Sequence, residues 1–230
     1  MGPLRQFSET PMSDLALQKT GPAAPAEAAI AAALGRRSIV LVGMMGAGKS
    51  SVGRRLAARL GIPFVDADAK IEEAAQMTIA DIFETYGEAD FRSAEARVIA
   101  RLLEGGPQVL ATGGGAFMNA ETRAAVRAKG ITFWLKADFE VLLRRVKRRS
   151  DRPLLKTGDP AETLKRLMAE RYPVYAEADV TIHSRDVPHE KIVDEILASL
   201  SERLGLPEPA RNARAGRVSS SAVSATTRIG

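Results

Sequence analysis

A lysine and a serine directly after a short apolar run have the types and spacing needed to bind nucleotide phosphates. Ile39–Val42 is followed by Gly43, four further residues, Gly48, Lys49 and Ser50, which is the spacing of a phosphate-binding loop. Glycines let the backbone turn its N–H groups toward phosphate oxygens, and the next helix directs its positive end to the same point. Lysine adds a cation for the β- and γ-phosphates, and serine offers a hydroxyl to Mg²⁺. This stretch therefore predicts a nucleotide site.

Two carboxylates, Asp66 and Asp68, follow the next apolar stretch. In an extended segment, residues two apart face the same side, so we expect both to point into the nucleotide site. One of them could hold Mg²⁺ near Ser50, usually through water, since Mg²⁺ keeps much of its hydration. The other could accept a hydrogen bond from a substrate hydroxyl and orient or deprotonate it. A helix cap beside a solvated acid is the alternative interpretation.

A glycine triplet and an arginine–glutamate pair are candidates for binding an acceptor substrate. Three successive glycines, Gly113–Gly115, are costly for folding, which favours close approach of a ligand to the backbone. Arg92 and Glu95 are three residues apart on a predicted helix and share a face. Arg92 could therefore grip a carboxylate with two hydrogen bonds while Glu95 holds its guanidinium. The alternatives are a flexible turn and a surface ion pair.

Basic residues gather further along the chain. Lys or Arg occupies six of the nine positions in Arg144–Arg152. Phosphoryl transfer needs positive charge over the transferring group, which an arginine on a closing loop often supplies. A solvated basic helix end is the alternative here, and also for Arg171. His183 and His189 have no spacing typical of a catalytic triad or a zinc site.

The elements that must position these residues alternate between strand and helix. Such alternation predicts an α/β fold, a parallel sheet with helices on both faces. Ligands of such sheets bind at the carboxyl ends of the strands, where the candidate residues lie. The expected strands are 38–42, 63–66, 108–111, 131–135 and 179–183. The expected helices are 49–60, 71–75, 78–86, 88–104, 119–129, 139–148, 160–176 with an interruption near Pro173, and 188–204.

Composition is that of a globular protein, with 45% hydrophobic and 27% charged residues among 230. The chain has no cysteine, which excludes disulfides and suits a cytoplasmic protein. The net charge is +5, but the basic residues cluster in 144–152 and 206–230. Beside a phosphate loop such clusters more simply serve a nucleotide, so we expect no nucleic-acid partner. No run approaches the roughly 18–20 apolar residues of a membrane span, and the start lacks the features of a secretory signal.

Both ends of the chain have the composition of tails. Residues 1–36 are rich in Pro, Ala and Thr and are expected to be a disordered tail, with an Ala-rich helix possible over 27–34. Residues 206–230 are rich in Pro, Arg and Ser with few large apolar side chains, so disorder is expected there too. One domain, 37–205, remains between them.

The order and spacing of the motifs resemble those of the shikimate kinase family from about Ile39 to Leu204. The motifs that carry the resemblance are GMMGAGKSSVGRRLA, FVDADAKIEE, IADIFETYGEADFRSAE, ATGGGA, DRPLL and ERYPVYAEAD. The family phosphorylates the 3-hydroxyl of shikimate with ATP. The resemblance implies a nucleoside-monophosphate-kinase-like α/β fold, a three-layer sandwich. Its five parallel strands would be in order 2-3-1-4-5, with a mobile lid at about 147–159. Relative to the family the tails are additional, and the lid segment 147–151 is unusually basic.

The resemblance also implies a role for each site residue. ATP would be bound by Gly46, Ala47, Gly48, Lys49, Ser50, Ser51, Arg145, which would stack on adenine, and Arg152, the lid arginine. Mg²⁺ would be held by Ser50 and, through water, Asp66. Shikimate would be bound by Asp68, Arg92, Gly114, Gly115 and Arg171, the two arginines chiefly at its carboxylate. Catalysis would depend on Asp68, Arg152 and Lys49. A cytoplasmic monomer is expected.

Two other functions stay open at this point. One is a kinase of another small hydroxylated substrate, such as gluconate or a nucleotide. The other is a nucleotide-binding module that transfers no phosphate and whose tails recruit a partner. The intact pair of Asp66 and Asp68 and the lid arginine count against this second alternative.

Overall fold

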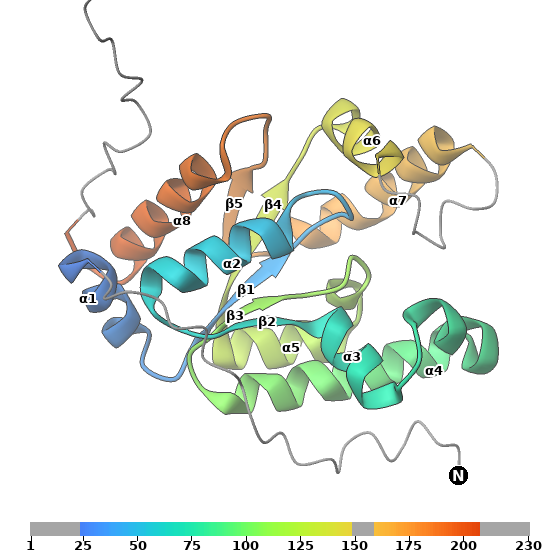
Figure 1. Cartoon of the computed structure of the whole chain (residues 1–230), viewed down its shortest axis with the longest axis horizontal. Coiled ribbons are helices and arrows are strands. Elements are labelled where there is room, and N and C mark those ends of the chain that lie inside the picture. Colours follow the sequence, from blue (N-terminus) through green and yellow to red (C-terminus); the bar gives the residue numbers. More distant parts are fainter. Residues whose placement is uncertain (1–23, 149–158, 208–230) are drawn as a thin grey trace, which may run out of the picture.

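Five strands form one parallel sheet at the centre of the protein. The computed structural model describes residues 24–148 and 159–207. The sheet order is β2-β3-β1-β4-β5, and every neighbouring pair is parallel (Figure 1). This confirms the predicted fold class and strand order. The strands are β1 Ser38–Val42, β2 Phe64–Asp66, β3 Val109–Ala111, β4 Gly130–Lys136 and β5 Val180–His183.

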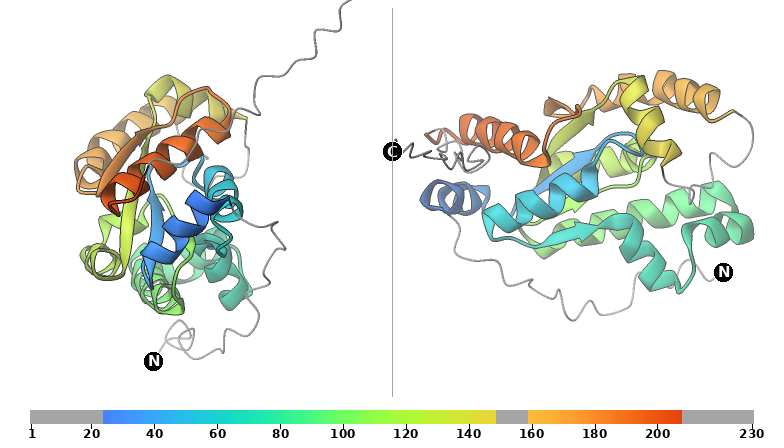
Figure 2. Two further views of the ribbon diagram at one scale, coloured as in Figure 1. Left: turned by 90° about the vertical axis from the view of Figure 1, so that its left-hand side faces the viewer. Right: turned by 45° about the horizontal axis from the view of Figure 1, so that its top comes forward.

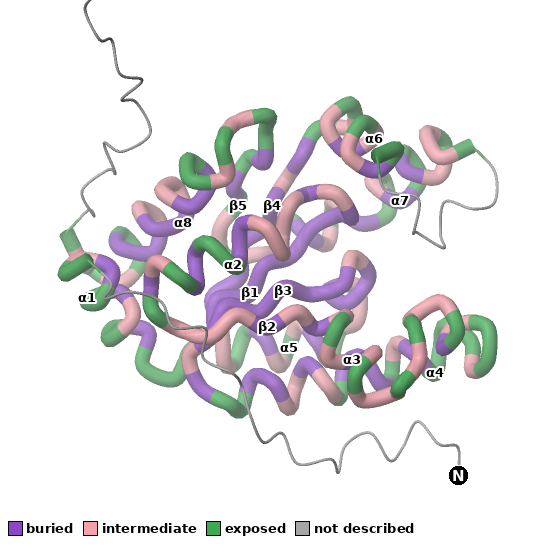
Figure 3. The backbone as a smooth tube through the Cα atoms, in the orientation of Figure 1, coloured by how far each residue is buried: buried purple, intermediate pink, exposed green. Residues whose placement is uncertain are grey.

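The central strand β1 is buried along its whole length. In the register of the sheet, Val40 lies between Leu110 of β3 and Thr132 of β4. A continuous apolar run is typical of a strand that is covered on both faces, and helices cover both faces here. Figure 3 shows the resulting core as a buried band through the middle of the molecule.

Helices lie on both sides of the sheet, which gives the predicted three layers (Figure 2). Helices α2 and α8 pack on one face, whereas α5 lies on the other beside the C-terminal half of α4. The helices are α1 Pro25–Leu34, α2 Lys49–Leu60, α3 Ala67–Ala75, α4 Ile79–Leu102, α5 Ala120–Lys129, α6 Phe139–Lys147, α7 Pro160–Tyr175 and α8 His189–Arg203, with short 3₁₀ turns η2 Leu103–Gly105 and η3 Ala116–Met118.

Helix α1 corrects the prediction of a disordered tail for its own residues, Pro25–Leu34, and confirms the Ala-rich helix expected over 27–34. Ile30 and Leu34 lie one turn apart, and both are buried in the main core. The Glu27 carboxylate also pairs with Arg59 of α2. In Figure 1, α1 lies beside the ends of α2 and α8. Burial of this apolar face stabilises a helix that its alanine-rich sequence alone would leave marginal.

Two predicted helix interruptions have different outcomes. Gly87 has φ 80° and ψ 169° inside α4, so the predicted break between two helical segments is confirmed. The predicted interruption near Pro173 is wrong, because α7 continues through that residue to Tyr175. Pro173 stands in the last turn, where the missing N–H removes only one hydrogen bond of the helix.

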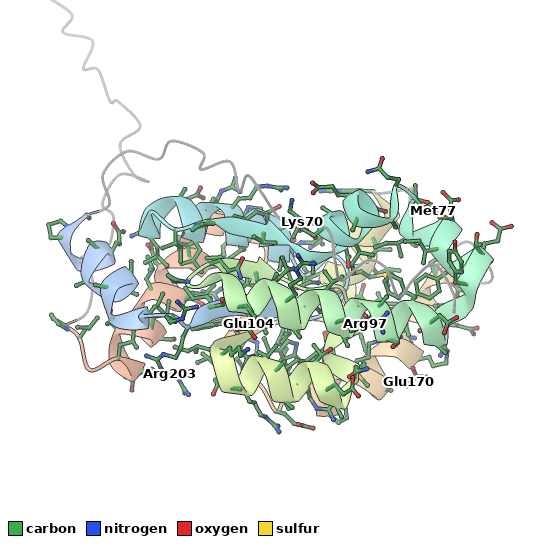
Figure 4. The ribbon with its side chains drawn as sticks, turned by 90° about the horizontal axis from the view of Figure 1, so that it is seen from below. Lys70, Met77, Arg97, Glu104, Glu170 and Arg203 are labelled. Atoms are coloured by element: carbon green, nitrogen blue, oxygen red, sulfur yellow. The ribbon has the colours of Figure 1, made fainter. Side chains whose placement is uncertain are left out.

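A second, smaller core holds α3 against the first part of α4. Its buried members are Ile71, Ile82, Phe91 and Ala94. Figure 4 shows α3, with the labelled Lys70, beside α4, with the labelled Arg97, on the face of the molecule that is seen from below. This packing matters for function because Asp68 lies in the first turn of α3 and Arg92 follows Phe91 on α4.

Several predicted features lie outside the described residues. These are Arg152, most of the expected lid (149–158), and residues 1–23 and 208–230. Over the two described ranges, no helix combines the length and the apolar character that crossing a membrane requires.

Candidate active site

The loop between β1 and α2 has the conformation of a phosphate-binding loop. Gly43 has φ 138° and Gly48 has φ 96°, values that residues with a side chain rarely adopt. A Cβ at Gly43 would also stand 2.8 Å from the Leu135 carbonyl oxygen. Lys49 Nζ donates to the carbonyls of Gly43 at 2.8 Å and Met44 at 3.1 Å. The lysine thus lies along the loop at the N-terminus of α2, where its charge and the helix dipole both favour an anion.

Two side chains from distant elements fasten the outer side of this loop. Ser184, the first residue after β5, donates from Oγ to the Ala47 carbonyl at 2.8 Å. Arg145 of α6 donates from Nη1 to the Gly46 carbonyl at 3.2 Å and to Ser184 Oγ at 3.0 Å. These hydrogen bonds hold the carbonyls of Gly46 and Ala47 toward α6 and the end of β5. Ser184 was not a predicted site residue, although its place at a strand end is a signal that could have found it.

Ser50 and Asp66 meet at the carboxyl edge of the sheet. Ser50 Oγ donates to Asp66 Oδ2 at 2.7 Å. A hydroxyl and a carboxylate oxygen side by side are hard ligands of the kind that Mg²⁺ prefers. Within the described residues, no three His, Cys, Asp or Glu side chains gather to hold a metal without other help. The pair therefore fits an ion that takes its remaining ligands from water and phosphate.

Asp68 lies in the first turn of α3, which corrects the expected extended segment Asp66–Asp68. The chain turns into a helix at Ala67, so the two carboxylates do not alternate as in a strand. Asp68 nevertheless faces the glycine triplet, because its Oδ1 lies 2.6 Å from the point where a Cβ of Gly113 would stand. Burial, followed by the neighbouring Asp66 charge, raises the pKa of Asp68 above its ordinary value. A higher pKa makes this carboxylate a better proton acceptor.

Arg92 and Glu95 form an ion pair in which the glutamate is buried and the arginine is partly buried; Arg92 also pairs with the exposed Glu88. Arg92 Nη1 donates to Glu95 Oε2 at 2.7 Å, and the Glu95 residue is only 1% exposed. Burial raises the pKa of Glu95, while the arginine stabilises its ionised form. The guanidinium is pressed against Gly115, where a Cβ would stand 2.7 Å from Nη1. The prediction that Glu95 holds Arg92 in place is confirmed in its geometry.

Arg171 brings a second guanidinium to the same glycine loop from α7. The residue is 7% exposed, and its Nη1 lies 3.3 Å from the point where a Cβ of Gly114 would stand. Among the described residues, Arg171 forms no salt bridge, although its charge acts on the Glu95 carboxylate and offsets part of the rise that burial causes in the pKa of that group. A buried charge that is not paired directly is costly. An anionic ligand between Arg171 and the loop would compensate that charge.

The predicted acceptor-binding residues therefore come together around one loop, although they come from four parts of the chain. Asp68 and Glu95 flank Gly113, Arg171 lies over Gly114, and Arg92 lies over Gly115. Figure 1 shows that this loop, the phosphate loop and the start of α3 lie at the same edge of the sheet. Such an arrangement can bring a phosphoryl donor and an anionic, hydroxylated acceptor together.

Comparison with known proteins gives the family of this chain. The family model described as shikimate kinase matches residues 45–201. The chain belongs to the shikimate kinase family. The shikimate kinase of Rhodopseudomonas palustris is 68% identical over 185 residues, which cover 80% of this chain and 91% of the relative. The shikimate kinase of Bradyrhizobium diazoefficiens is 64% identical over 193 residues, which cover 84% of this chain and 92% of the relative.

A solved structure of the same family agrees. It is described as shikimate kinase from Acinetobacter baumannii in complex with shikimate, and it is 39% identical to this chain. The two superpose with a TM-score of 0.71 over 73% of this chain and 94% of that chain. The resemblance inferred from the motifs is confirmed. Membership of the shikimate kinase family argues against both the gluconate or nucleotide kinase and the non-catalytic module.

Proposed function

We propose that this protein transfers the γ-phosphoryl group of ATP to the 3-hydroxyl of shikimate, giving shikimate 3-phosphate and ADP. Family membership is the first support. The observation in the structure that carries the proposal is the buried Arg171, whose guanidinium forms no salt bridge among the described residues. A ring that carries both a carboxylate and hydroxyls would compensate this charge while presenting a hydroxyl to Asp68.

On the acceptor side, we assign the carboxylate to the two arginines and the hydroxyl to Asp68. Arg171 lies against Gly114 and Arg92 lies against Gly115, and guanidinium groups bind carboxylates through paired hydrogen bonds. The amides of Gly114 and Gly115 would add backbone contacts. Asp68, with its raised pKa, would accept the hydroxyl hydrogen bond and orient the oxygen for attack.

On the donor side, we assign the ATP phosphates to the amides of the phosphate loop and to Lys49. The proposed nucleotide-binding residues are Gly46, Ala47, Gly48, Lys49, Ser50, Ser51, Arg145 and Arg152. Arg145 donates a hydrogen bond to the Gly46 carbonyl and therefore lies beside the phosphate loop. From this position its guanidinium would stack on the adenine of bound ATP. Arg152, outside the described residues, would neutralise charge on the transferring group from the lid at 147–159.

Ser50 and Asp66 would hold Mg²⁺, Asp66 through water. Their oxygens are 2.7 Å apart and have the chemistry that the ion requires. When bound, Mg²⁺ would supply positive charge that offsets the negative charge of the phosphate oxygens. We further propose that residues 37–205, together with α1, which packs into the same core, act as the kinase domain of a cytoplasmic monomer.

An ADP-release assay across acceptors tests the proposal. Protein, ATP and Mg²⁺ are incubated with shikimate, gluconate or nucleoside monophosphates, and the product is examined by ³¹P NMR. We expect turnover with shikimate and a phosphate on its 3-oxygen. The methyl ester of shikimate, which lacks the carboxylate charge, should be roughly 10–100-fold poorer in kcat/KM, since hydrogen bonds between charged groups are lost.

Two results would overturn the proposal. Turnover with gluconate or a nucleotide, but not with shikimate, would indicate a kinase of another metabolite. ATP binding without turnover of any acceptor would indicate a nucleotide-binding module.

A further inference from the structure

Tyr175, the last residue of α7, is fully buried beneath the glycine loop. Its exposed fraction is 0%, and its hydroxyl donates to the Gly114 carbonyl. The Arg171 guanidinium, four residues earlier on α7, reaches the same glycine, since its Nη1 lies 3.3 Å from the point where a Cβ of Gly114 would stand. The Tyr175 hydroxyl and the Arg171 guanidinium therefore both lie against Gly114.

The surroundings of Tyr175 keep this hydroxyl neutral and in place. Burial raises the pKa of Tyr175 to about 12, so the hydroxyl retains its proton at neutral pH. Its ring packs with Trp134 of β4 at 6.0 Å and with Tyr172 at 6.3 Å between ring centroids. The hydroxyl oxygen also lies 3.9 Å from Met44 Sδ in the phosphate loop. An aromatic cluster on the sheet thus fixes the position of the oxygen.

We propose that Tyr175 is a positioning residue for the acceptor, which holds the Arg171 guanidinium and the Gly114 peptide at a fixed separation. An acceptor that binds its carboxylate to Arg171 and contacts the Gly114 amide requires both groups in one geometry at once. Without the hydroxyl, the Gly114 carbonyl loses its partner, and the Gly114 peptide gains freedom to move relative to the Arg171 guanidinium. This inference rests on the proposed function, because it assumes that Arg171 and Gly114 bind shikimate.

Helix α7 also offers a matched control. Tyr172 lies one turn from Tyr175, and its hydroxyl likewise donates to a backbone carbonyl, that of Ala137. Burial raises the pKa of Tyr172 to about 12 as well, and its ring packs against Trp134 at 5.0 Å. Tyr172→Phe therefore removes the same atom and the same kind of hydrogen bond from the same cluster. The difference is that Ala137, which precedes α6, does not belong to the acceptor site.

The test compares Tyr175→Phe with Tyr172→Phe. We expect Tyr175→Phe to raise KM for shikimate roughly 10-fold, the effect of about one lost hydrogen bond to a charged group. The KM for ATP should change less than about 2-fold. Tyr172→Phe should leave both KM values unchanged. The two variants should lower Tm by similar amounts, because each loses one hydrogen bond from a tyrosine hydroxyl to a backbone carbonyl. Equal KM values for shikimate in the two variants, or equal rises in both KM values of Tyr175→Phe, would overturn the inference.

A double-mutant cycle with Arg171→Lys tests whether Tyr175 acts through Arg171. If it does, adding Tyr175→Phe to Arg171→Lys should raise KM for shikimate by much less than the 10-fold seen in the wild-type background. A rise in KM for shikimate in the double variant that equals the product of the two single-variant rises would contradict the inference.

Direct binding separates this inference from the proposed function. Trp134 is the one tryptophan of the chain, and its fluorescence can follow a shikimate titration in the absence of ATP. A wild-type protein that neither binds nor phosphorylates shikimate would refute the proposed function and this inference with it. A wild-type protein that does both, beside a Tyr175→Phe variant with wild-type shikimate affinity, would refute this inference alone.

Discussion

Replacing Gly113 with alanine should slow phosphoryl transfer about 100-fold without unfolding the protein. A Cβ at this position would stand 2.6 Å from Asp68 Oδ1 and 2.7 Å from Glu95 Oε1. Ordinary contact begins at 3.4 Å, so the Asp68 oxygen must move by about 0.8 Å and the Glu95 oxygen by about 0.7 Å. Gly113 is not among the residues with positive φ, so its backbone can accept a side chain.

The size of the effect follows from what has to move. Both clashing atoms are the ends of side chains, so the protein can relieve the contact without disturbing its backbone. The substitution then mainly changes the position of the attacking hydroxyl relative to the phosphoryl group. A misplacement of about 1 Å can reduce the rate on the order of 10²-fold. Displacement of Asp68 turns the proposed acceptor of the hydroxyl proton away from the reacting oxygen.

The assay is kcat from ADP release at saturating shikimate and ATP, together with Tm. Gly105→Ala is the matched control, because Gly105 also lacks a positive φ and a Cβ there would meet nothing within 4 Å. It should retain wild-type kcat. Wild-type kcat and KM in Gly113→Ala would refute the assignment of Asp68 to the reacting hydroxyl.

Three further predictions concern the other site residues. Gly115→Ala should raise KM for shikimate about 10-fold with little change in KM for ATP, because its Cβ would stand 2.7 Å from Arg92 Nη1 and displace the guanidinium; an unchanged KM would count against the role of Arg92. Asp68→Asn should abolish transfer and raise Tm at pH 7, because burial raises the pKa of Asp68 and ionisation therefore destabilises the folded state. The Tm difference from wild type should shrink as the pH falls toward the ordinary value of 3.8, and a lower Tm at pH 7 than wild type would contradict this sign. Arg152→Ala should lower kcat roughly 10²-fold or more with ATP affinity retained, and an unchanged kcat would remove Arg152 from that role.

Local sequence signals were sufficient for the sheet and the phosphate loop. The structure of β1 and of the glycine-rich loop after it depends on a few neighbouring residues, so both could be predicted. The break at Gly87 is of the same kind. The order of the strands came from the family resemblance, because strand order depends on which distant segments pair.

Features that depend on distant contacts escaped prediction. Helix α1 is ordered because Ile30 and Leu34 enter a core formed by residues much later in the chain. Tyr175 acts on a loop 61 residues away, and no local pattern marks a hydroxyl that will meet a remote carbonyl. Ser184 acts on a loop 137 residues away, and its place at a strand end marks it as a candidate without indicating its partner. The position of Asp68 at the carboxyl edge of the sheet was predicted from an extended segment Asp66–Asp68. The segment is not extended, since α3 starts at Ala67, one residue before Asp68.

The central claim is that Asp68 holds the hydroxyl of shikimate that receives the phosphoryl group. The most direct measurement is the distance from the Asp68 carboxylate to each ring hydroxyl in a crystal structure with shikimate and an unreactive ATP analogue. We predict that the 3-hydroxyl oxygen lies about 2.6–3.2 Å from a carboxylate oxygen and in line with the γ-phosphorus. An Asp68 carboxylate that points away from the ring, or a different hydroxyl facing the γ-phosphate, would contradict the account.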